Sequence, residues 1–306
     1  MTADRPSSGA EAVSVRQEQP TAELVEAVIA LAEDCRSVDT VNPFSEQAIL
    51  RLRHGATTAT HALAHGSGGE LTGYLQLVDD DGATVAELAV APDHRWRGIG
   101  TALARWAFEH VGPGRTVRAW AHGNGAPAAA MAAALGLTAR RVLLQMRRSA
   151  KDPLPAVSVP AGIRIRAFRP GQDDAAWVQV NARAFAGHPE QGRLGGTDLR
   201  ERMAEPWFDP PGFFVAERTD PDRLVGFHWT KVHDRERLGE VYVIGIDPDE
   251  RGTGLGLALT VTGLAHLVAL GLPTLMLYAD ESNTGAVRMY ERLGFTVAFT
   301  DVTYER

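Results

Sequence analysis

Hydrophobic and polar residues follow the same order at two places in this chain. Residues 85–103 (VAELAVAPDHRWRGIGTAL) and 241–259 (VYVIGIDPDERGTGLGLAL) each give a strand-like apolar run, a Pro, an Arg, and then Gly-x-Gly at the start of an apolar helix. Pro92 and Pro248 lie 156 residues apart, and the same spacing relates the Arg and both glycines of the two copies. Because this spacing is close to half of the 306 residues, the pattern predicts a tandem duplication.

The periodicity around each copy predicts the same order of elements. The first half is expected to hold helices at 21–36, 43–53 and 127–135 and strands at 57–63, 71–78, 116–121 and 141–146. The second half is expected to hold helices at 174–185, 255–271 and 284–293 and strands at 213–217, 224–231, 274–279 and 296–300. Prolines in residues 151–161 indicate an extended linker, so we expect one domain at 12–150 and another at 162–306.

The composition limits the class of protein. Apolar residues make up 44% of the chain and charged residues 23%, as in ordinary globular proteins, while a formal charge of −7 argues against nucleic acid as a partner. Cys35 is the only cysteine, which excludes an internal disulfide and fits a reducing compartment. No signal or lipidation motif is visible near the N-terminus. We therefore expect a cytoplasmic monomer that binds no nucleic acid and no membrane.

One long uncharged stretch could be mistaken for a membrane span. Residues 252–279 contain no Asp, Glu, Lys or Arg. Gly263, Gly271 and Pro273 interrupt the stretch, so it is expected to form a buried helix, a turn and a core strand.

The glycine-rich segment after each repeated strand predicts a site for an anion. Glycines let the backbone approach a ligand closely, and the first amides of the following helix carry the positive end of its dipole. The second copy, Arg251-Gly-Thr-Gly-Leu-Gly-Leu, lacks the third glycine of a dinucleotide-binding fingerprint, because that position is Leu257, and it lacks the Gly-Lys-Ser/Thr of a Walker loop. The loop is therefore expected to bind a phosphate, but as a motif different from these two.

Together with a second motif, this segment resembles a known family. Arg-x-x-Gly-x-Gly before a helix and a strand, followed by Asn283, Ala286, Tyr290 and Gly294-Phe295, is the pattern of the Gcn5-related N-acetyltransferases. The resemblance implies an α/β fold with two tandem acyl-CoA N-acyltransferase domains, each a mixed, mostly antiparallel sheet flanked by helices. It also implies acetyl-CoA as co-substrate, with its pyrophosphate on the loop amides and its pantetheine along the repeated strand.

The same resemblance implies which positions hold acetyl-CoA in each copy. In the first copy they are Leu88, Ala89, Val90, Trp96, Arg97, Gly98, Ile99, Gly100 and Thr101. In the second they are Ile244, Gly245, Ile246, Arg251, Gly252, Thr253, Gly254, Leu255, Gly256, Leu257, Asn283, Thr284, Gly285, Ala286, Val287 and Arg288.

Acetyl transfer to an amine needs a base and an acid. An α-amino group titrates at roughly 7.7 to 8, so a modest base suffices. Glu240 begins the repeated strand of the second copy, where the resemblance makes it the general base, directly or through a water. Tyr290 lies two helical turns after Asn283 and is expected to protonate the departing coenzyme thiolate.

Longer irregular stretches resemble a tandem subgroup of the family that acetylates the cysteinyl amine of cysteinyl-glucosaminyl-inositol. They are FAGHPEQG (185–192), EPWFDPPG (205–212), GFHWTKVH (226–233) and LGEVYVIGIDP (238–248). This resemblance makes Glu190, Lys231, Glu240 and Tyr278 substrate contacts, and we add Glu46. Two alternatives stay open, in which Lys231 is a solvated lysine at a strand end and Glu46 belongs to the first turn of a helix capped by Ser45.

The first copy is predicted to lack the chemistry. The spacing of 156 places Thr84 opposite Glu240, and aligning the two Leu-Gly pairs after the last helix places Ala132 opposite Tyr290. Gly98 remains, so the first copy is expected to bind cofactor without catalysis. Two other functions remain open, a tandem acetyltransferase for another small amine or a protein N-terminus, and a non-catalytic acyl-CoA sensor.

A metal site is not expected. His188, His228 and His233 have no HExxH spacing and no cysteine partners. Packing or exposure to solvent explains these histidines better than metal ligation.

Overall fold

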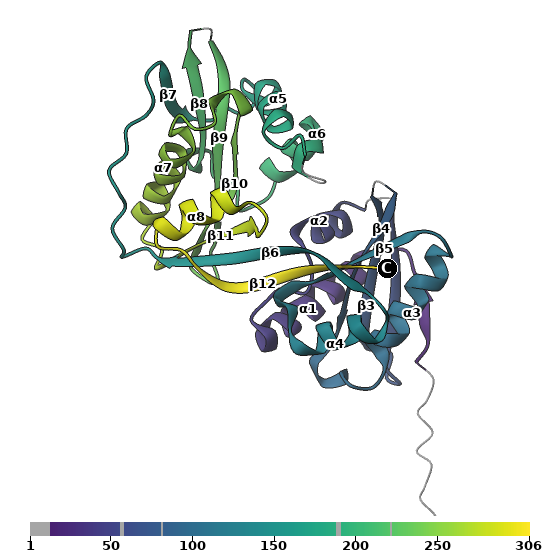
Figure 1. Ribbon diagram of the computed structural model, residues 1–306. Coiled ribbons are helices and arrows are strands. Elements are labelled where there is room, and N and C mark those ends of the chain that lie inside the picture. The colour runs from purple at the N-terminus through teal and green to yellow at the C-terminus, as the bar shows by residue number, and fades with distance from the viewer. Residues whose placement is uncertain (1–12, 56–57, 81, 188–190, 221) are drawn as a thin grey trace, which may run out of the picture. The chain divides into compact units, whose positions relative to one another are not determined.

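The computed structural model divides into two compact units (Figure 1). It describes residues 13–55, 58–80, 82–187, 191–220 and 222–306. The first unit contains the chain up to Val142 together with Thr300–Arg306, and the second contains Leu143–Phe299.

The two compact units do not coincide with the two sequence repeats, because the last strand of each repeat belongs largely to the other unit. The last strand of the first repeat, β6 (Thr138–Ser149), pairs antiparallel with β11 (Thr274–Asp280) of the second unit. The last strand of the chain, β12 (Thr296–Glu305), pairs antiparallel with β5 (Thr116–Ala121) of the first unit. Each unit therefore completes its sheet with residues from the other repeat, and the expected linker at 151–161 lies inside the second unit rather than between the units.

The sheet of the first unit has the order β1-β2-β3-β4-β5-β12. Its pairs are antiparallel except β4 with β5, which is parallel. The strands not yet given are β1 (Val15–Gln17), β2 (Ala59–His65), β3 (Leu71–Asp80) and β4 (Ala83–Val90). The helices are α1 (Ala22–Asp39), α2 (Glu46–His54), α3 (Ile99–Val111) and α4 (Ala126–Ala134).

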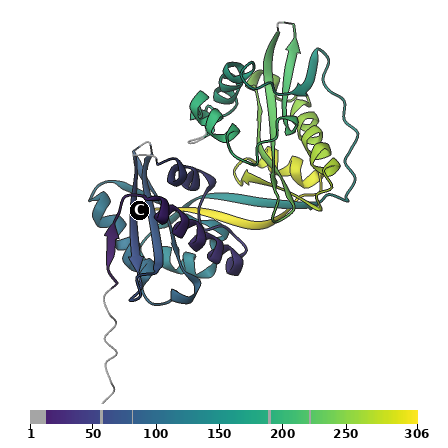
Figure 2. The same cartoon turned by 180° about the vertical axis from the view of Figure 1, so that it is seen from behind.

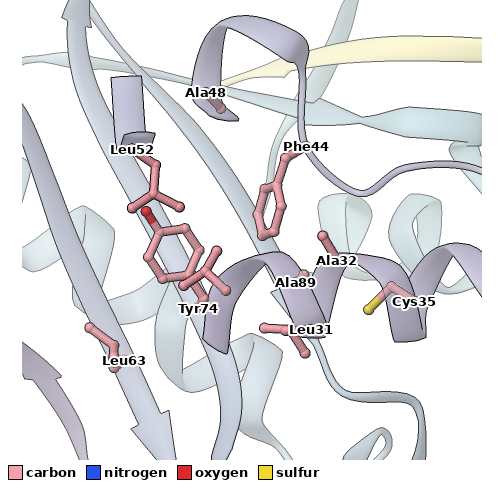
Figure 3. Close-up of a cluster of buried hydrophobic side chains, with 10 residues drawn as sticks. Leu31, Ala32, Cys35, Phe44, Ala48, Leu52, Leu63, Tyr74 and Ala89 are labelled. Carbon is pink, nitrogen blue, oxygen red and sulfur yellow. The ribbon is translucent and has the colours of Figure 1, made fainter. Parts of the chain in front are cut away.

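Alternate side chains of these strands fill two cores, because successive residues of a strand point to opposite faces. On one face Tyr74 and Ala89 pack with Leu31 of α1 and with Phe44 and Leu52 around α2 (Figure 3). The Tyr74 ring meets the edge of Phe44 at 5.4 Å between centroids. The opposite face carries a second cluster under α3.

The second unit repeats this plan with the order β6-β11-β10-β9-β8-β7. Only β10 with β11 is parallel among the pairs found there. The strands not yet given are β7 (Ile163–Ala167), β8 (Phe213–Thr219), β9 (Asp222–His233) and β10 (Leu238–Ile246). The helices are α5 (Asp174–Ala184), α6 (Gly196–Met203), α7 (Leu255–Ala269) and α8 (Thr284–Arg292).

Helices cover both faces of this second sheet. The α7 helix lies on one side of β8 to β10, and α5 and α6 lie on the other, as the front and back views both show (Figures 1 and 2). The α5 side holds an aromatic core in which Phe213 stacks on Trp229 at 4.3 Å between centroids. The α7 side holds aliphatic residues such as Leu255 and Leu259.

The α/β class and the mixed, mostly antiparallel sheets are confirmed. The helices and strands named from periodicity are found with ends shifted by a few residues, and β6, β9 and β12 are longer than expected. Three elements were missed, namely β1, β7 and α6. Their sequences are short, and that of α6, GTDLRERM, is mostly polar, so no apolar period marks them.

The uncharged stretch at 252–279 forms α7, a turn at Gly271 and β11. Across the residues that the structure describes, no helix combines the length and apolar character needed to cross a membrane.

A buried ion network links four elements of the first unit. His122 follows β5, and its Nδ1 lies 3.1 Å from Asp301 Oδ2 while its Nε2 lies 3.4 Å from Glu87 Oε2. Burial acts to lower the pKa of His122, but the hydrogen bonds to the two carboxylates outweigh it and raise that pKa to about 10. Glu87 also accepts hydrogen bonds from the Ser45 amide and hydroxyl, both at 2.6 Å. The network thus connects β4, the start of α2, the end of β5 and β12.

Replacing His122 by Gln should weaken the fold by about 3 kcal/mol at pH 7, because it leaves two buried carboxylates without their cation. The pKa is raised in the folded state, so the stability from the charge is present below the unfolded value near 6.5 and is lost as the pH rises toward about 10. Denaturant unfolding followed by circular dichroism at pH 7 and pH 10 measures both effects.

His110→Gln is the matched control, since His110 is exposed and stacks on Trp106. This variant should change stability by less than about 0.5 kcal/mol. A His122→Gln protein with the stability and pH dependence of the parent would contradict the prediction.

Candidate active site

In the second unit, two neighbouring parallel strands separate part-way along their length. β10 pairs with β11 only over Leu238–Val241, although β10 continues to Ile246. Ile244, Gly245 and Ile246 therefore lie in the separated segment, where their backbone groups on the β11 side are not used by that strand. Such a strand edge can hydrogen-bond an extended ligand.

The separated segment begins at a β-bulge. Val241 stands opposite Thr230 of β9 and Val243 opposite Trp229, so Tyr242 has no residue opposite it. Because of this extra residue, the side chains before the bulge point to the opposite face from the one that regular alternation with the residues after it would give.

Glu240 stands just before the bulge and is buried, with 7% of its surface exposed. Its residue partner across the ladder is Lys231, and His233 lies two residues farther along β9 on the same face. Glu240 Oε2 lies 2.7 Å from Nε2 of His233, whose side chain is 29% exposed. The predicted base is therefore a buried carboxylate with a partly buried imidazole as neighbour.

Lys231 contacts two aromatic rings. Its Nζ lies 4.4 Å from the ring centroid of Trp207 and 5.3 Å from that of Tyr242. The Tyr242 hydroxyl in turn accepts a hydrogen bond from Arg202 Nε at 3.0 Å. Cation–π contacts of this kind hold an ammonium in place, so Lys231 is not merely a solvated lysine at a strand end.

Tyr278 lies on β11 just beyond the last residue paired with β10. It is 39% exposed, and its hydroxyl accepts a hydrogen bond from Gln145 Nε2 at 2.7 Å. Tyr278 shares a face of β11 with Met276, and Met276 stands beside Glu240 in the ladder. The structure thus brings Lys231, Glu240 and Tyr278 to one face of the second sheet.

Tyr290 lies on α8 and is buried, with 5% of its surface exposed. Its ring meets the edge of Phe295 at 6.0 Å between centroids. Burial raises the pKa of its hydroxyl to about 12, so the group stays protonated at neutral pH. Within the described part of the chain, no hydrogen bond to this hydroxyl is found, which leaves it able to donate to a ligand.

Two further predicted substrate residues cannot be assigned to this sheet face. Glu190 and the neighbouring His188 lie outside the described residues. Glu46 belongs to the first unit, where it is the first residue of α2. Ser45 caps that helix by accepting a hydrogen bond from the Ala48 amide at 3.1 Å, as the alternative for Glu46 expected.

The predicted anion cradle lies at the start of α7. Gly252 and Gly254 have φ of 78° and 92°, values that favour glycine. Gly254 has no side chain to cap the helix, the Leu255 amide donates only a long hydrogen bond to Thr253 Oγ1 at 3.4 Å, and the first turn has no acidic residue. An added Cβ at either glycine would meet no atom within 4 Å, so the space beside the first amides of α7 is open.

Buried acids brace this cradle, and they were missed from the sequence. Asp247 accepts hydrogen bonds from Arg183 Nε and Nη2, both at 2.9 Å, and the Arg183 pair chiefly holds its pKa at about 2. Glu250 is buried and pairs with Arg218 at 2.6 Å. The string Asp-Pro-Asp-Glu looks like an exposed turn, because sequence alone does not show which of its carboxylates turn inward to distant arginines.

The other positions expected at this cofactor site lie in the glycine loop, in the first turn of α7 and at the start of α8. Arg251 and Thr253 belong to its loop, and Leu255, Gly256 and Leu257 begin α7. Asn283 caps α8 by accepting a hydrogen bond from the Ala286 amide at 3.3 Å. Thr284, Gly285, Val287 and Arg288 follow in the first turns of that helix.

The first unit has a similar cradle. Gly98, with φ of 84°, precedes α3, and Trp96 beside it is 86% exposed. Arg95 donates hydrogen bonds to both carboxylate oxygens of Asp39, at 2.8 and 2.6 Å. β4 pairs with β5 only over Ala83–Ala86, so Leu88, Ala89 and Val90 lie in a separated segment as well.

The strand register corrects one alignment between the copies. In the first unit the β3–β4 ladder has no bulge, so Val85 rather than Thr84 stands where Glu240 stands in the second. The parallel ladders agree, because Val85 pairs with Arg118 at the position where Glu240 pairs with Met276. Thr84 instead donates a hydrogen bond to Asp79 at 2.8 Å. The first copy still lacks a carboxylate at this place.

The histidines do not form a metal cluster in the described residues, where no group of three or more His, Cys, Asp or Glu could hold a metal ion. His228 is buried with Nδ1 2.8 Å from the Leu259 carbonyl oxygen. Burial lowers its pKa to about 4, so it is neutral at pH 7.

The model of the acetyltransferase (GNAT) family matches residues 23–137 and 184–295 of this chain. The chain belongs to this family. The two matched segments contain the two cradles and the two repeated strands, so the tandem duplication of the GNAT domain is confirmed. The chain is thus an N-acetyltransferase, and the family fold implies binding of acetyl-CoA.

Curated relatives match nearly the whole chain. A mycothiol acetyltransferase from Thermobispora bispora is 51% identical over 286 residues, covering 92% of this chain and 95% of the relative. A protein of the same name from Streptomyces scabiei is 50% identical over 300 residues, covering 97% and 96%.

Solved structures share the fold at lower identity. A tandem GNAT protein from the clavulanic acid biosynthesis pathway has a TM-score of 0.72 and 20% identity, covering 96% of this chain and 98% of its own. A Gcn5-related N-acetyltransferase from Sphaerobacter thermophilus has a TM-score of 0.67 and 24% identity, covering 95% of both chains. These likenesses concern the fold of this GNAT protein alone.

The two cradles predict different consequences for the same substitution. Gly254→Val should abolish turnover and weaken acetyl-CoA binding, because φ of 92° strains any L side chain and a branched one crowds the α7 amides. Gly98→Val imposes the same strain at φ of 84° and should leave turnover largely intact while removing at most one bound cofactor. Calorimetric titration with acetyl-CoA and a turnover assay compare the two variants.

Each variant is the matched control for the other, since both replace the glycine before a cradle helix. Circular dichroism melts check that both are folded. A folded but inactive Gly98→Val protein would show that the first copy takes part in catalysis.

Proposed function

We propose that this GNAT protein transfers the acetyl group of acetyl-CoA to the cysteinyl amine of cysteinyl-glucosaminyl-inositol, the last step of mycothiol biosynthesis. The observation that carries the proposal is identity of about half of all positions, over more than nine tenths of the chain, to proteins named mycothiol acetyltransferase. The convergence of Lys231, Glu240 and Tyr278 on one sheet face supports a small polar amine as the acceptor.

Acetyl-CoA is the co-substrate in this proposal, and the described residues fit it. The uncapped start of α7, with open space beside Gly252 and Gly254, suits a pyrophosphate. The separated segment Ile244–Ile246 offers backbone groups to a pantetheine chain. When bound, the co-substrate supplies an activated acetyl thioester.

Glu240 acts as the general base. It takes a proton from the substrate ammonium, directly or through one water, and the freed electron pair on nitrogen attacks the thioester carbonyl carbon. Its place at the head of β10, just before the strands separate, supports this role. Its burial keeps bulk water from competing for the carboxylate.

Tyr290 acts as the general acid. The carbon–sulfur bond breaks as the amide forms, and the phenol proton passes to the departing thiolate. A protonated hydroxyl with a pKa raised to about 12 and no partner among described residues supports this assignment. The attacking nitrogen loses its second proton to water as the amide forms, the phenolate is reprotonated from water, and Glu240 returns its proton to solvent.

Lys231, Tyr278 and Glu190 complete the proposed substrate contacts within the second repeat. Lys231 presents an ammonium fixed by Trp207, and Tyr278, a residue that is 39% exposed, presents a hydroxyl that Gln145 holds in place. Groups of this kind suit the hydroxyls of a sugar–inositol ligand. The first copy, with Val85 and Ala132 at the base and acid positions, is proposed to be catalytically inactive.

Coenzyme A release across a panel of amines tests the function. The panel contains cysteinyl-glucosaminyl-inositol, an aminoglycoside, a peptide with a free N-terminus and glucosaminyl-inositol, which lacks the cysteinyl amine. We expect the first compound to give the highest kcat/KM. Faster release with the peptide or the aminoglycoside would replace the proposed acceptor, and no release with any amine would favour an acyl-CoA sensor.

Glu240→Gln is the matched catalytic control for this panel. It keeps the shape of the side chain and removes its basicity, so turnover of the best amine should fall roughly 100- to 10,000-fold with acetyl-CoA affinity retained. Near-normal turnover at neutral pH would remove Glu240 from the mechanism.

Tyr290→Phe should lower kcat and leave the affinity for acetyl-CoA nearly unchanged, because a proton given to the leaving thiolate matters mainly in the transition state. The expected loss is about 100-fold, measured by pre-steady-state kinetics so that chemistry is observed directly. Tyr304→Phe, which removes a hydroxyl bonded to Asn124 in the first unit, is the control and should leave kcat unchanged. An unchanged chemical step in Tyr290→Phe would make Tyr290 a packing residue.

A further inference from the structure

His233 ends β9 next to the proposed base. In the β9–β10 ladder it stands opposite Leu238, two residues before Glu240, so its ring and the carboxylate share one face. His233 Nε2 and Glu240 Oε2 are 2.7 Å apart, a full hydrogen bond. A second His–carboxylate contact, between His266 Nε2 and Asp209 Oδ2, is longer at 3.5 Å.

The direction of this hydrogen bond follows from the chemistry of a base. A carboxylate that is ready to take a proton is ionised and can only accept hydrogen bonds. His233 Nε2 must therefore carry the proton and donate it toward Oε2. Across the described residues, Oε1 of Glu240 accepts no hydrogen bond, so this oxygen is left for the substrate.

We propose that His233 is a positioning residue for the base. It holds one carboxylate oxygen of Glu240, fixes the rotation of the carboxyl group and directs the other oxygen at the substrate ammonium. This inference rests on the proposed role of Glu240 as base. Orientation of a reacting group carries a large share of catalysis, and a small misplacement is costly.

The neighbouring cation on β9 makes this restraint necessary. Lys231 stands directly opposite Glu240, and an unrestrained carboxylate would turn toward its ammonium. The rings of Trp207 and Tyr242 hold the Lys231 ammonium from one side, and His233 holds the carboxylate from the other. Two separate restraints thus keep the base and the cation in distinct places on the same sheet face.

The first copy provides an independent comparison within the same chain. Its β3–β4 ladder places Val85 at the position of Glu240 and Asp80 at the position of His233. The imidazole is therefore present in the copy that has the carboxylate and absent from the copy that lacks it.

Two variants of His233 separate positioning from packing. His233→Gln keeps an N–H donor at a similar reach, whereas His233→Leu keeps bulk and loses the donor. We expect His233→Leu to lower kcat about 10- to 100-fold with KM for acetyl-CoA within about twofold, and His233→Gln to keep most of the activity. The assay uses the full chain, acetyl-CoA and cysteinyl-glucosaminyl-inositol, or whichever amine the panel shows to be faster.

A double-mutant cycle with Glu240→Gln gives the decisive readout. If His233 acts through Glu240, adding His233→Leu to Glu240→Gln should change kcat by less than about twofold. His266→Leu is the matched control, because it removes an imidazole of α7 that lies beside the Asp209 carboxylate, and it should leave kcat unchanged.

Three results would overturn the proposal: an unchanged kcat in His233→Leu, an equal loss in His233→Gln and His233→Leu, or losses that multiply in the double variant. The failure of the underlying function is distinguishable. An active Glu240→Gln enzyme would remove the base itself, and with it the role of His233. An inactive Glu240→Gln enzyme beside a normal His233→Leu enzyme would remove only the role of His233.

Discussion

The bulge at Tyr242 is the constraint on which the candidate site depends. Side chains of a strand alternate between faces, so one extra residue moves every side chain before it to the other face relative to those after it. Glu240 lies before the bulge and the cofactor segment Ile244–Ile246 after it. Without the bulge, the carboxylate would point toward α7 and away from Lys231, His233 and Tyr278. Pairing between β10 and β11 ends at the same place, so the bulge region determines both the face to which Glu240 points and the point where the two strands separate.

The two copies show how one scaffold keeps a cradle while differing in chemistry. Both have a separated strand, a glycine with positive φ and an uncapped helix start. In the first copy the ladder is regular and β4 instead carries Glu87 at the position of Val243. Glu87 is buried against His122 and Ser45, where paired charges link the end of β5 to the start of α2. Buried ions of this kind have a structural role, because their hydrogen-bonding groups are already taken by one another and are not available to a substrate.

Buried charge also supports the site of the second unit. Asp247 and Glu250 turn inward from the cradle loop and pair with Arg183 and Arg218. These ion pairs hold in place the loop that would meet a phosphate. Charge-assisted pairs of this geometry are stronger than neutral hydrogen bonds. The cradle thus offers a ligand mostly backbone amide groups, and the charged side chains near the loop hold that backbone in place.

The sequence by itself determined the duplication, the two cradles, the class of fold and the candidate base and acid. Periodicity, glycine spacing and a repeated string are local properties of the chain, so they survive without knowledge of distant contacts. Only the tertiary structure decided which residues stand opposite one another. It showed that Val85, not Thr84, stands at the position of Glu240. It also placed the last strand of each repeat in the sheet of the other unit and brought His233 into hydrogen-bond contact with Glu240. A bulge, a strand partner and an inward-turned carboxylate each depend on segments far apart in the chain, and no local pattern encodes them.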